Sequence, residues 1–143
     1  MDIKIDRKIV HASTGGRQPE KEEEAIILIH GAGMNRTAWQ LQTRNISHRG
    51  FRTYALDLPG HGRSDGPVHK NIEEMANWVN RVLEVMEIDQ ATIIGPSMGA
   101  LVALDFGARF ESITKRLILI GAADSLSLIH ISEPTRPERI ADC

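Results

Sequence analysis

Short apolar runs recur along the chain, separated by longer segments in which apolar residues have a helical spacing. The run Ala25–Ile29 is continuously apolar and rich in β-branched residues, which is typical of a strand buried on both faces of a parallel sheet. Further short strands are predicted at 52–56, 90–94 and 116–121. The chain therefore predicts a core of buried strands joined by helices.

The first residues have a different pattern, because polar and apolar positions alternate. Segments 2–5 and 8–11 predict a hairpin of two edge strands. After the buried strand that follows, a helix is expected over about 37–48, with Trp39 and two other apolar side chains, Leu41 and Ile46, available for packing. Gly50 would end this helix.

The clearest helical pattern begins behind Asn71, which is suited to cap a helix that has an acidic residue three positions later. Apolar residues then follow at helical spacing, namely Ile72, Met75, Ala76, Val79, Val82, Leu83 and Met86. Another helix is expected from Met98 to about Phe110. It is apolar nearly all round, so the sequence predicts that it is covered on every side, and its small residues would let it lie close to the sheet.

Strands and helices in this alternation predict an α/β fold with a doubly wound, mostly parallel sheet and helices on both faces. Ligands in such sheets bind at the carboxyl ends of the strands. Three loops of unusual composition fall there: the loop that starts at His30, the loop that starts at Asp57, and the turn at Ser97. The sequence thus places one candidate site at that edge.

The turn Gly95-Pro96-Ser97-Met98-Gly99 follows one predicted strand and opens a predicted helix. A serine held at the apex of so tight a turn takes a strained backbone conformation, and glycine on both sides avoids a clash between the two chain segments. Free N–H groups of the helix start would face the site. The simpler alternative is a glycine-rich turn with an ordinary serine.

Composition and charge narrow the class of protein. The 143 residues are enough for one domain with a core, and the apolar content of 41%, the charged content of 25% and the net charge of −2 are ordinary for a soluble protein. This slightly negative net charge gives no reason to expect binding to nucleic acid or to an anionic membrane. No apolar run approaches the roughly 20 residues of a membrane helix. Cys143 is the single cysteine, so neither a disulfide nor a cysteine-based metal site is expected. We therefore expect a cytoplasmic enzyme or binding domain, without a cofactor or metal.

The loop over 57–67 is rich in glycine, so we also consider whether it binds phosphate. Its spacing is not that of a P-loop, and no helix opens directly on it. The sequence therefore disfavours phosphate binding.

Together, H-G-A-G at 30–33, D-L-P-G-H-G-R-S-D-G-P at 57–67 and G-P-S-M-G at 95–99 resemble the α/β-hydrolase superfamily, in its esterase, lipase and carbon–carbon hydrolase branch. The resemblance covers about residues 3–124. It implies that Ser97 is a nucleophile that forms an acyl-enzyme. It also implies an oxyanion hole made by the backbone N–H groups of Ala32 and Met98.

The resemblance gives the two histidines of these motifs structural roles: His30 shapes the oxyanion loop and His61 fixes a turn. Serine at the elbow separates this chain from the branches with an aspartate nucleophile. Pro96 departs from the family pattern, which often has histidine or another side chain before the serine. Proline fixes φ and lacks an N–H, which puts the elbow geometry and activity in doubt. Met34, Asn35 and Trp39 are candidate pocket residues, although packing is the expected role of Trp39.

In this family the acid and the histidine of the triad follow the serine in that order. Asp124 is a weak candidate for the acid, and His130 would complete the order. However, residues 126–136 resemble a translated sequencing-library adapter. We therefore expect 1–125 to be the N-terminal portion of a hydrolase domain and 126–143 to be a non-native tail. On this reading the chain is an inactive fragment of a serine hydrolase; the alternative is a non-catalytic small-molecule binding protein of the same fold.

Overall fold

The structure is a computed structural model, and it describes residues 1–121. These residues form one mixed six-stranded sheet with helices packed against it. Its strand order is β1-β2-β4-β3-β5-β6. The strands are β1 (Asp2–Ile5), β2 (Lys8–Ser13), β3 (Ala25–Ile29), β4 (Arg52–Leu56), β5 (Ala91–Pro96) and β6 (Thr114–Ile120). The helices are α1 (Gln40–His48), α2 (Ile72–Val85) and α3 (Met98–Arg109), with short 3₁₀ helices η1 (Arg36–Trp39) and η2 (Glu111–Ile113).

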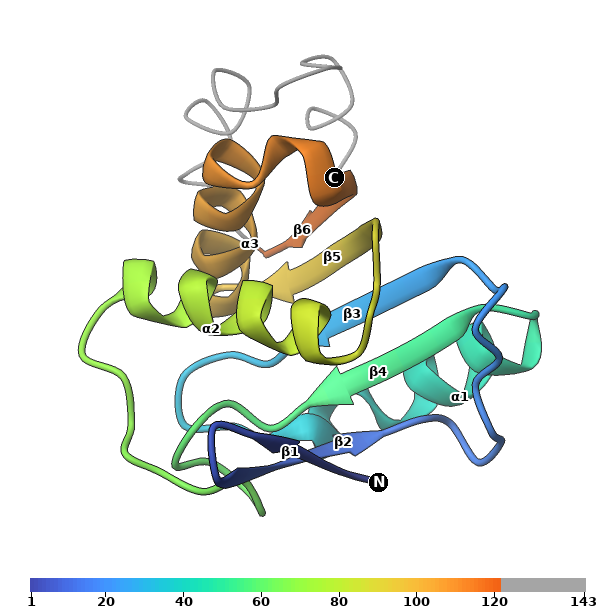
Figure 1. Cartoon of the computed structure of the whole chain (residues 1–143), viewed down its shortest axis with the longest axis horizontal. Helices are drawn as coiled ribbons and strands as arrows, with labels where there is room; N and C mark the ends of the chain where they lie inside the picture. The colour runs from blue at the N-terminus through green and yellow to red at the C-terminus, as the bar shows by residue number, and fades with distance from the viewer. Residues whose placement is uncertain (122–143) are drawn as a thin grey trace.

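Strands β4, β3, β5 and β6 are parallel, as the apolar runs predict. The hairpin of β1 and β2 joins this group through an antiparallel pairing of β2 with β4. In the centre, Ile27 of β3 lies between Tyr54 of β4 and Ile93 of β5. All five residues of β3 are buried, which agrees with its unbroken apolar sequence. The carboxyl ends of these strands consequently meet at one edge of the sheet (Figure 1).

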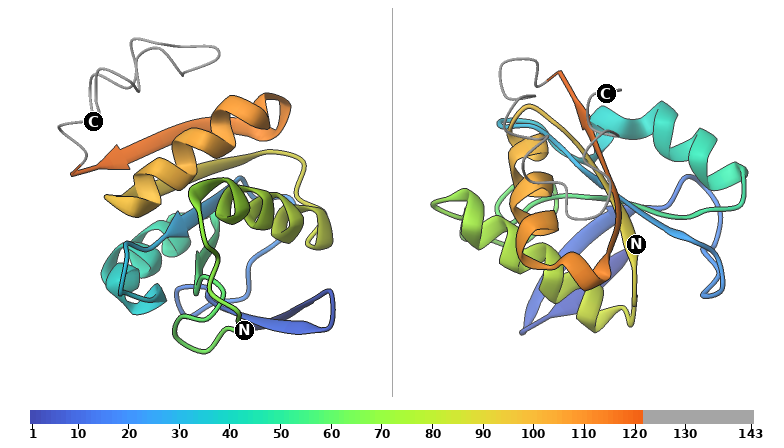
Figure 2. Two further views of the ribbon diagram at one scale, coloured as in Figure 1. Left: turned by 90° about the vertical axis from the view of Figure 1, so that its left-hand side faces the viewer. Right: turned by 90° about the horizontal axis from the view of Figure 1, so that it is seen from above.

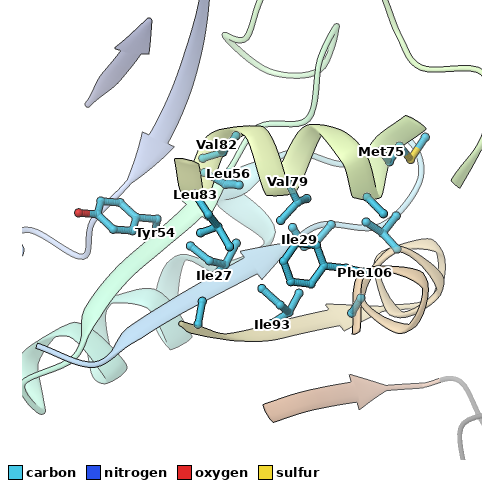
Figure 3. Close-up of a cluster of buried hydrophobic side chains, with 14 of the residues drawn as sticks. Ile27, Ile29, Tyr54, Leu56, Met75, Val79, Val82, Leu83, Ile93 and Phe106 are labelled. Atoms are coloured by element: carbon cyan, nitrogen blue, oxygen red, sulfur yellow. The ribbon is translucent and has the colours of Figure 1, made fainter. Parts of the chain in front are cut away.

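Helices cover the two faces of the sheet unequally. α2 and α3 lie on one face and α1 lies on the other (Figures 1 and 2). The larger core lies under α2 and α3, where Val79 and Phe106 pack over Ile29 and Ile93 (Figure 3). Under α1 there is a smaller cluster of buried residues: Ile26, Leu28, Trp39, Ala55 and Ile94. The doubly wound arrangement expected from the sequence is therefore present.

The start of α2 follows the expected cap. The Asn71 side chain accepts a hydrogen bond of 2.8 Å from the Glu74 N–H, which satisfies one of the free donors of the first turn. The Glu74 carboxylate in turn accepts from the Lys70 N–H at 3.0 Å. This is one residue before the position a regular capping box uses, so the box is a variant, as the sequence indicates.

Two packing expectations are wrong. Leu41, expected to pack, is 73% exposed, because it lies two residues after the buried Trp39 and residues two apart on a helix do not share a face. α3 is not covered on every side, since Leu101 is 42% exposed on its outer face. The apolar character of α3 thus exceeds what packing within residues 1–121 buries. Across this same range, no helix is long and apolar enough to cross a membrane.

Phe106 and Leu101 give a matched test of the core, because both are large apolar residues of α3 but only Phe106 is fully buried. We expect Phe106→Ala to lower the free energy of unfolding by about 3–5 kcal/mol, since it removes buried surface and leaves a cavity. Leu101→Ala should change it by less than about 1 kcal/mol. Urea denaturation followed by circular dichroism measures both, and equal losses would contradict this packing.

Candidate active site

Ser97 lies at the turn between β5 and α3, where the chain reverses at the carboxyl edge of the sheet. Its backbone has φ 48° and ψ −116°, a sparsely populated conformation for a residue with a side chain. Such a conformation costs of order 1–3 kcal/mol, so the surrounding structure must hold it in place. The residue is exposed, so its hydroxyl can meet a molecule from solvent.

The two glycines that flank Ser97 hold this turn tight, as the spacing predicts. A Cβ atom at Gly95 would collide with the carbonyl group of Gly99. A Cβ atom at Gly99 would lie 2.6 Å from the Ile29 carbonyl oxygen and 3.0 Å from that of His30. Real Cβ atoms essentially never come that close to backbone, so both positions require glycine.

Proline at position 96 is accommodated in the turn. Pro96 is the last residue of β5 and lies in register with Ile120 of β6. The next residue maintains the link between these strands, because the Ser97 N–H donates to the Ile120 carbonyl at 3.3 Å. The elbow therefore forms with proline at this position, and the effect of Pro96 on activity stays a prediction.

The structure brings the loop 31–35, here called the oxyanion loop, next to the elbow. The start of α3 packs on the carboxyl end of β3 through Gly99, and a Cβ on Gly31 would lie 3.9 Å from the Pro96 carbonyl oxygen. Ala32 is exposed in this loop, and Met98 is the first residue of α3. The first N–H groups of an α-helix have no partner in a preceding turn, so the Met98 amide is a donor suited to an external oxygen.

His30 is fully buried between the oxyanion loop and the loop after β4. Its Nε2 accepts a hydrogen bond of 3.1 Å from the Leu58 N–H, so Nε2 carries no proton. Its Nδ1–H donates to the Gly31 carbonyl at 2.8 Å. Burial lowers the pKa of His30, which stabilises this neutral tautomer. With both nitrogens engaged, His30 shapes the loop and is not positioned to take a proton from a substrate.

The hydrogen bond from His30 also determines how the next amide points. The Gly31 carbonyl accepts from His30 and from the Met34 N–H at 3.2 Å, so its direction is fixed. In a trans peptide the carbonyl and the following N–H point in opposite directions. The Ala32 N–H, which belongs to the same peptide unit, is consequently directed away from the His30 ring.

The main feature that the sequence analysis missed is the burial of Asp57. This residue follows β4 and its side chain has no exposed surface. Its carboxylate accepts hydrogen bonds from the Arg36 N–H at 2.7 Å, the Arg36 guanidinium at 2.8 Å and the Arg63 N–H at 2.9 Å. Two sequence features could have indicated that Asp57 is buried. It directly follows a buried strand, and five positions later comes a glycine that lies against its carboxyl group. A Cβ on that glycine, Gly62, would collide with the carboxyl group.

Other candidate residues have clear positions. His61 donates through Nδ1 to the Pro59 carbonyl at 3.1 Å, as expected for a residue that fixes a turn. The Asn35 side chain caps η1, where it accepts from the Thr37 N–H at 2.9 Å, and Trp39 is buried in the cluster under α1. Of the three proposed pocket residues, only Met34, which is 47% exposed, has its side chain free to line a pocket.

The candidates for the other triad members, Asp124 and His130, lie outside the described residues. Their place relative to Ser97 therefore stays a prediction, as does the boundary after residue 125. Within the described residues, no group of three or more His, Cys, Asp or Glu side chains could hold a metal ion.

Comparison with known proteins identifies the family. The model of the alpha/beta hydrolase fold matches residues 24–139, so the chain belongs to the α/β-hydrolase family. An uncharacterized protein of Mycobacterium tuberculosis, Rv2715, is 40% identical over 99 residues, which are 68% of this chain and 29% of that protein. A 2-hydroxy-6-oxononadienedioate/2-hydroxy-6-oxononatrienedioate hydrolase of Comamonas testosteroni is 34% identical over 105 residues, 70% of this chain and 37% of that enzyme.

Solved structures agree on the fold. The enol-lactonase of Burkholderia xenovorans LB400 superposes with a TM-score of 0.72 at 24% identity, covering 82% of this chain and 45% of that one. Across the curated relatives, the chain spans between 29% and 51% of their length. Several of these relatives are named as hydrolases.

The buried neutral His30 leads to a prediction about acid stability. Its folded-state pKa lies below the ordinary value of 6.5, so the stability it contributes is complete above that pH. As the pH falls below about 6.5, the unfolded chain binds a proton that the folded chain excludes, and stability decreases by at most about 1.4 kcal/mol per pH unit. His69, whose pKa burial also lowers, acts in the same direction. Urea denaturation at pH 7.5 and 5.5 should show this loss. His30→Asn should reduce the loss, and an unchanged pH dependence in that variant would contradict the assignment.

Proposed function

We propose that this chain carries the nucleophile and the oxyanion hole of a serine hydrolase that acts on an ester or another carbonyl-containing small molecule. The observation that carries the proposal is the strained, exposed Ser97 at a strand-to-helix turn between two glycines that cannot be replaced. This is the geometry of a nucleophile elbow, in which the serine hydroxyl stands clear of the sheet. Membership of the α/β-hydrolase family supports the same reading.

The chemistry follows from the groups at the turn. The Ser97 Oγ attacks the carbonyl carbon of the substrate while a general base removes the hydroxyl proton. The carbonyl π electrons move to its oxygen, and the N–H groups of Ala32 and Met98 stabilise that negative charge. One such donor is typically worth about 3 kcal/mol in the transition state. Collapse of the intermediate expels the leaving group, which takes up the proton, and water then releases the acid from Ser97.

The substrate class is proposed from chemistry shared among the relatives. The related proteins include a 2-hydroxy-6-oxo-2,4-heptadienoate hydrolase of Pseudomonas putida and an enol-lactonase with the same fold. Both names describe hydrolysis of a small molecule that contains a carbonyl group. A small carbonyl compound is therefore the proposed partner of this chain, and its identity depends on parts of the pocket beyond the elbow and the oxyanion loop.

Covalent labelling tests the proposal. We expect a fluorophosphonate probe to modify the full-length gene product at Ser97, because the probe reacts with serines that a base and an oxyanion hole activate. Intact-mass and peptide mass spectrometry would locate the label. Ser97→Ala should abolish the labelling. Ser112→Ala, which changes an exposed serine two residues before β6, should leave the labelling unchanged.

A full-length protein that is folded and is not labelled would contradict the hydrolase proposal. If it still bound small carbonyl compounds at this edge of the sheet, the alternative of a non-catalytic binding protein would be supported. Labelling that persists in Ser97→Ala would place the reactive serine elsewhere.

The 143-residue chain by itself should not turn over p-nitrophenyl esters at a measurable rate. The resemblance places the general base after the last described strand, and the buried His30 has both ring nitrogens engaged. Spectrophotometric assay of the purified chain, with its fold checked by circular dichroism, measures this. Turnover that Ser97→Ala abolishes would show that the chain supplies its own base and would overturn this expectation.

A further inference from the structure

We propose that Asp57 is a positioning residue that holds the distal end of the oxyanion loop and so keeps the Ala32 N–H directed at the substrate oxygen. This inference rests on the proposed function of the elbow. Asp57 lies at the end of β4 and takes no part in the chemistry itself. Its effect is transmitted through Arg36, which directly follows the loop.

Asp57 binds the first residue after the loop through both backbone and side chain. The Arg36 N–H donates to Oδ1 at 2.7 Å, and the Arg36 guanidinium donates to Oδ2 at 2.8 Å. Charge-assisted hydrogen bonds of this length are the strong ones, and here the carboxylate is shielded from water. Arg36 is therefore fixed in position and in orientation.

The proximal end of the loop is fixed from the same strand. The Leu58 N–H, one residue after Asp57, donates to the ring of His30, and that ring holds the Gly31 carbonyl. The five residues of the loop therefore run between His30 and Arg36, each of which is held by a residue that directly follows β4. A loop tied at one end only could rotate its peptide planes, whereas one tied at both ends keeps them directed.

Asp57 can serve as an anchor because it is itself held rigidly. Its N–H donates to the His11 carbonyl of β2 at 2.9 Å, and its own carbonyl accepts from the Ser64 hydroxyl at 2.6 Å. The Arg63 N–H donates to Oδ2, which already accepts from the Arg36 guanidinium. The loop after β4 thus encloses the carboxylate, and this explains the contact that requires glycine at position 62.

The anchor requires a carboxylate and not merely a polar side chain. Two backbone N–H groups and one guanidinium converge on the two oxygens of Asp57. A carboxylate accepts at both oxygens, but an amide presents an NH₂ group at one of them. Asp57→Asn would therefore set a donor against a donor on one side. This substitution is nearly isosteric, so it tests the hydrogen bonds with little change in volume.

The same loop offers a matched control. Asp65 also accepts a backbone hydrogen bond, from the Ile9 N–H of β2 at 2.8 Å, but it is exposed and has no contact with the oxyanion loop among the hydrogen bonds of the described residues. Asp65→Asn changes the same chemistry in the same loop without touching Arg36. A difference between the two variants therefore reports on the anchor and not on general loosening of the loop after β4.

The experiment compares the full-length wild type, Asp57→Asn and Asp65→Asn, at a temperature where circular dichroism shows all three folded. We expect Asp57→Asn to lower kcat for a p-nitrophenyl ester about 10-fold or more with little change in KM, because a misdirected donor is lost from the transition state. Fluorophosphonate labelling of Ser97 should slow by a similar factor. Asp65→Asn should leave both rates within about 2-fold of wild type.

Amide hydrogen exchange supplies a readout that does not depend on activity. Exchange in the peptide that contains residues 31–35 should accelerate in Asp57→Asn and not in Asp65→Asn. Arg36→Ala, which keeps the backbone bond to Oδ1, should cause a smaller acceleration. A folded Asp57→Asn protein with normal kcat, or with unchanged exchange in this peptide, would overturn the proposal.

The two proposals fail in different ways. If the wild type is not labelled, the proposed function is wrong and the positioning role of Asp57 in catalysis is wrong with it, whatever the exchange data show. If the wild type is labelled and Asp57→Asn reacts equally fast, only the positioning role fails.

Discussion

The candidate site depends on one close contact, between the start of α3 and the carboxyl end of β3. Gly99 allows the helix to lie against the carbonyl groups of Ile29 and His30, and Gly95 allows the chain to fold back on Gly99. This contact holds Ser97 in its strained conformation, since any side chain at either position would separate the two segments. It also sets the distance between the elbow and the oxyanion loop. The proposed nucleophile and the proposed donor are thus both placed by backbone packing.

The fold and the turn at Ser97 could be predicted from the sequence because each requires particular residue types at nearby positions. A strand buried on both faces has no polar alternation, and Ala25–Ile29 shows this directly. The turn at Ser97 requires small residues at fixed offsets, and the chain has glycine at both. Asn71 predicts the start of α2 because capping uses neighbours only three residues apart. In each case the residues that decide the structure are close in sequence.

The features that the sequence did not predict depend on residues far apart in the chain. Asp57 is buried because Arg36, 21 residues earlier, and the following loop enclose it, and an aspartate in a loop is ordinarily exposed. Leu101 lies on the outer face of α3, and the sequence does not distinguish this face because α3 is apolar nearly all round. Periodicity gives the spacing of apolar positions, but it does not say which positions another element covers.

The donors of the proposed oxyanion hole are main-chain groups, and this determines where substitutions should matter. Ala32 and Met98 can change identity and keep their N–H groups, whereas the side chains that direct these groups cannot change so freely. His30 directs the Ala32 amide as a neutral ring, because it must donate at one nitrogen and accept at the other. Asp57 holds the far end of the loop as an acceptor only. His30 and Asp57 therefore need different hydrogen-bonding capacities, so neither residue could replace the other. Loss of either should affect catalysis through the backbone, without any contact to the substrate.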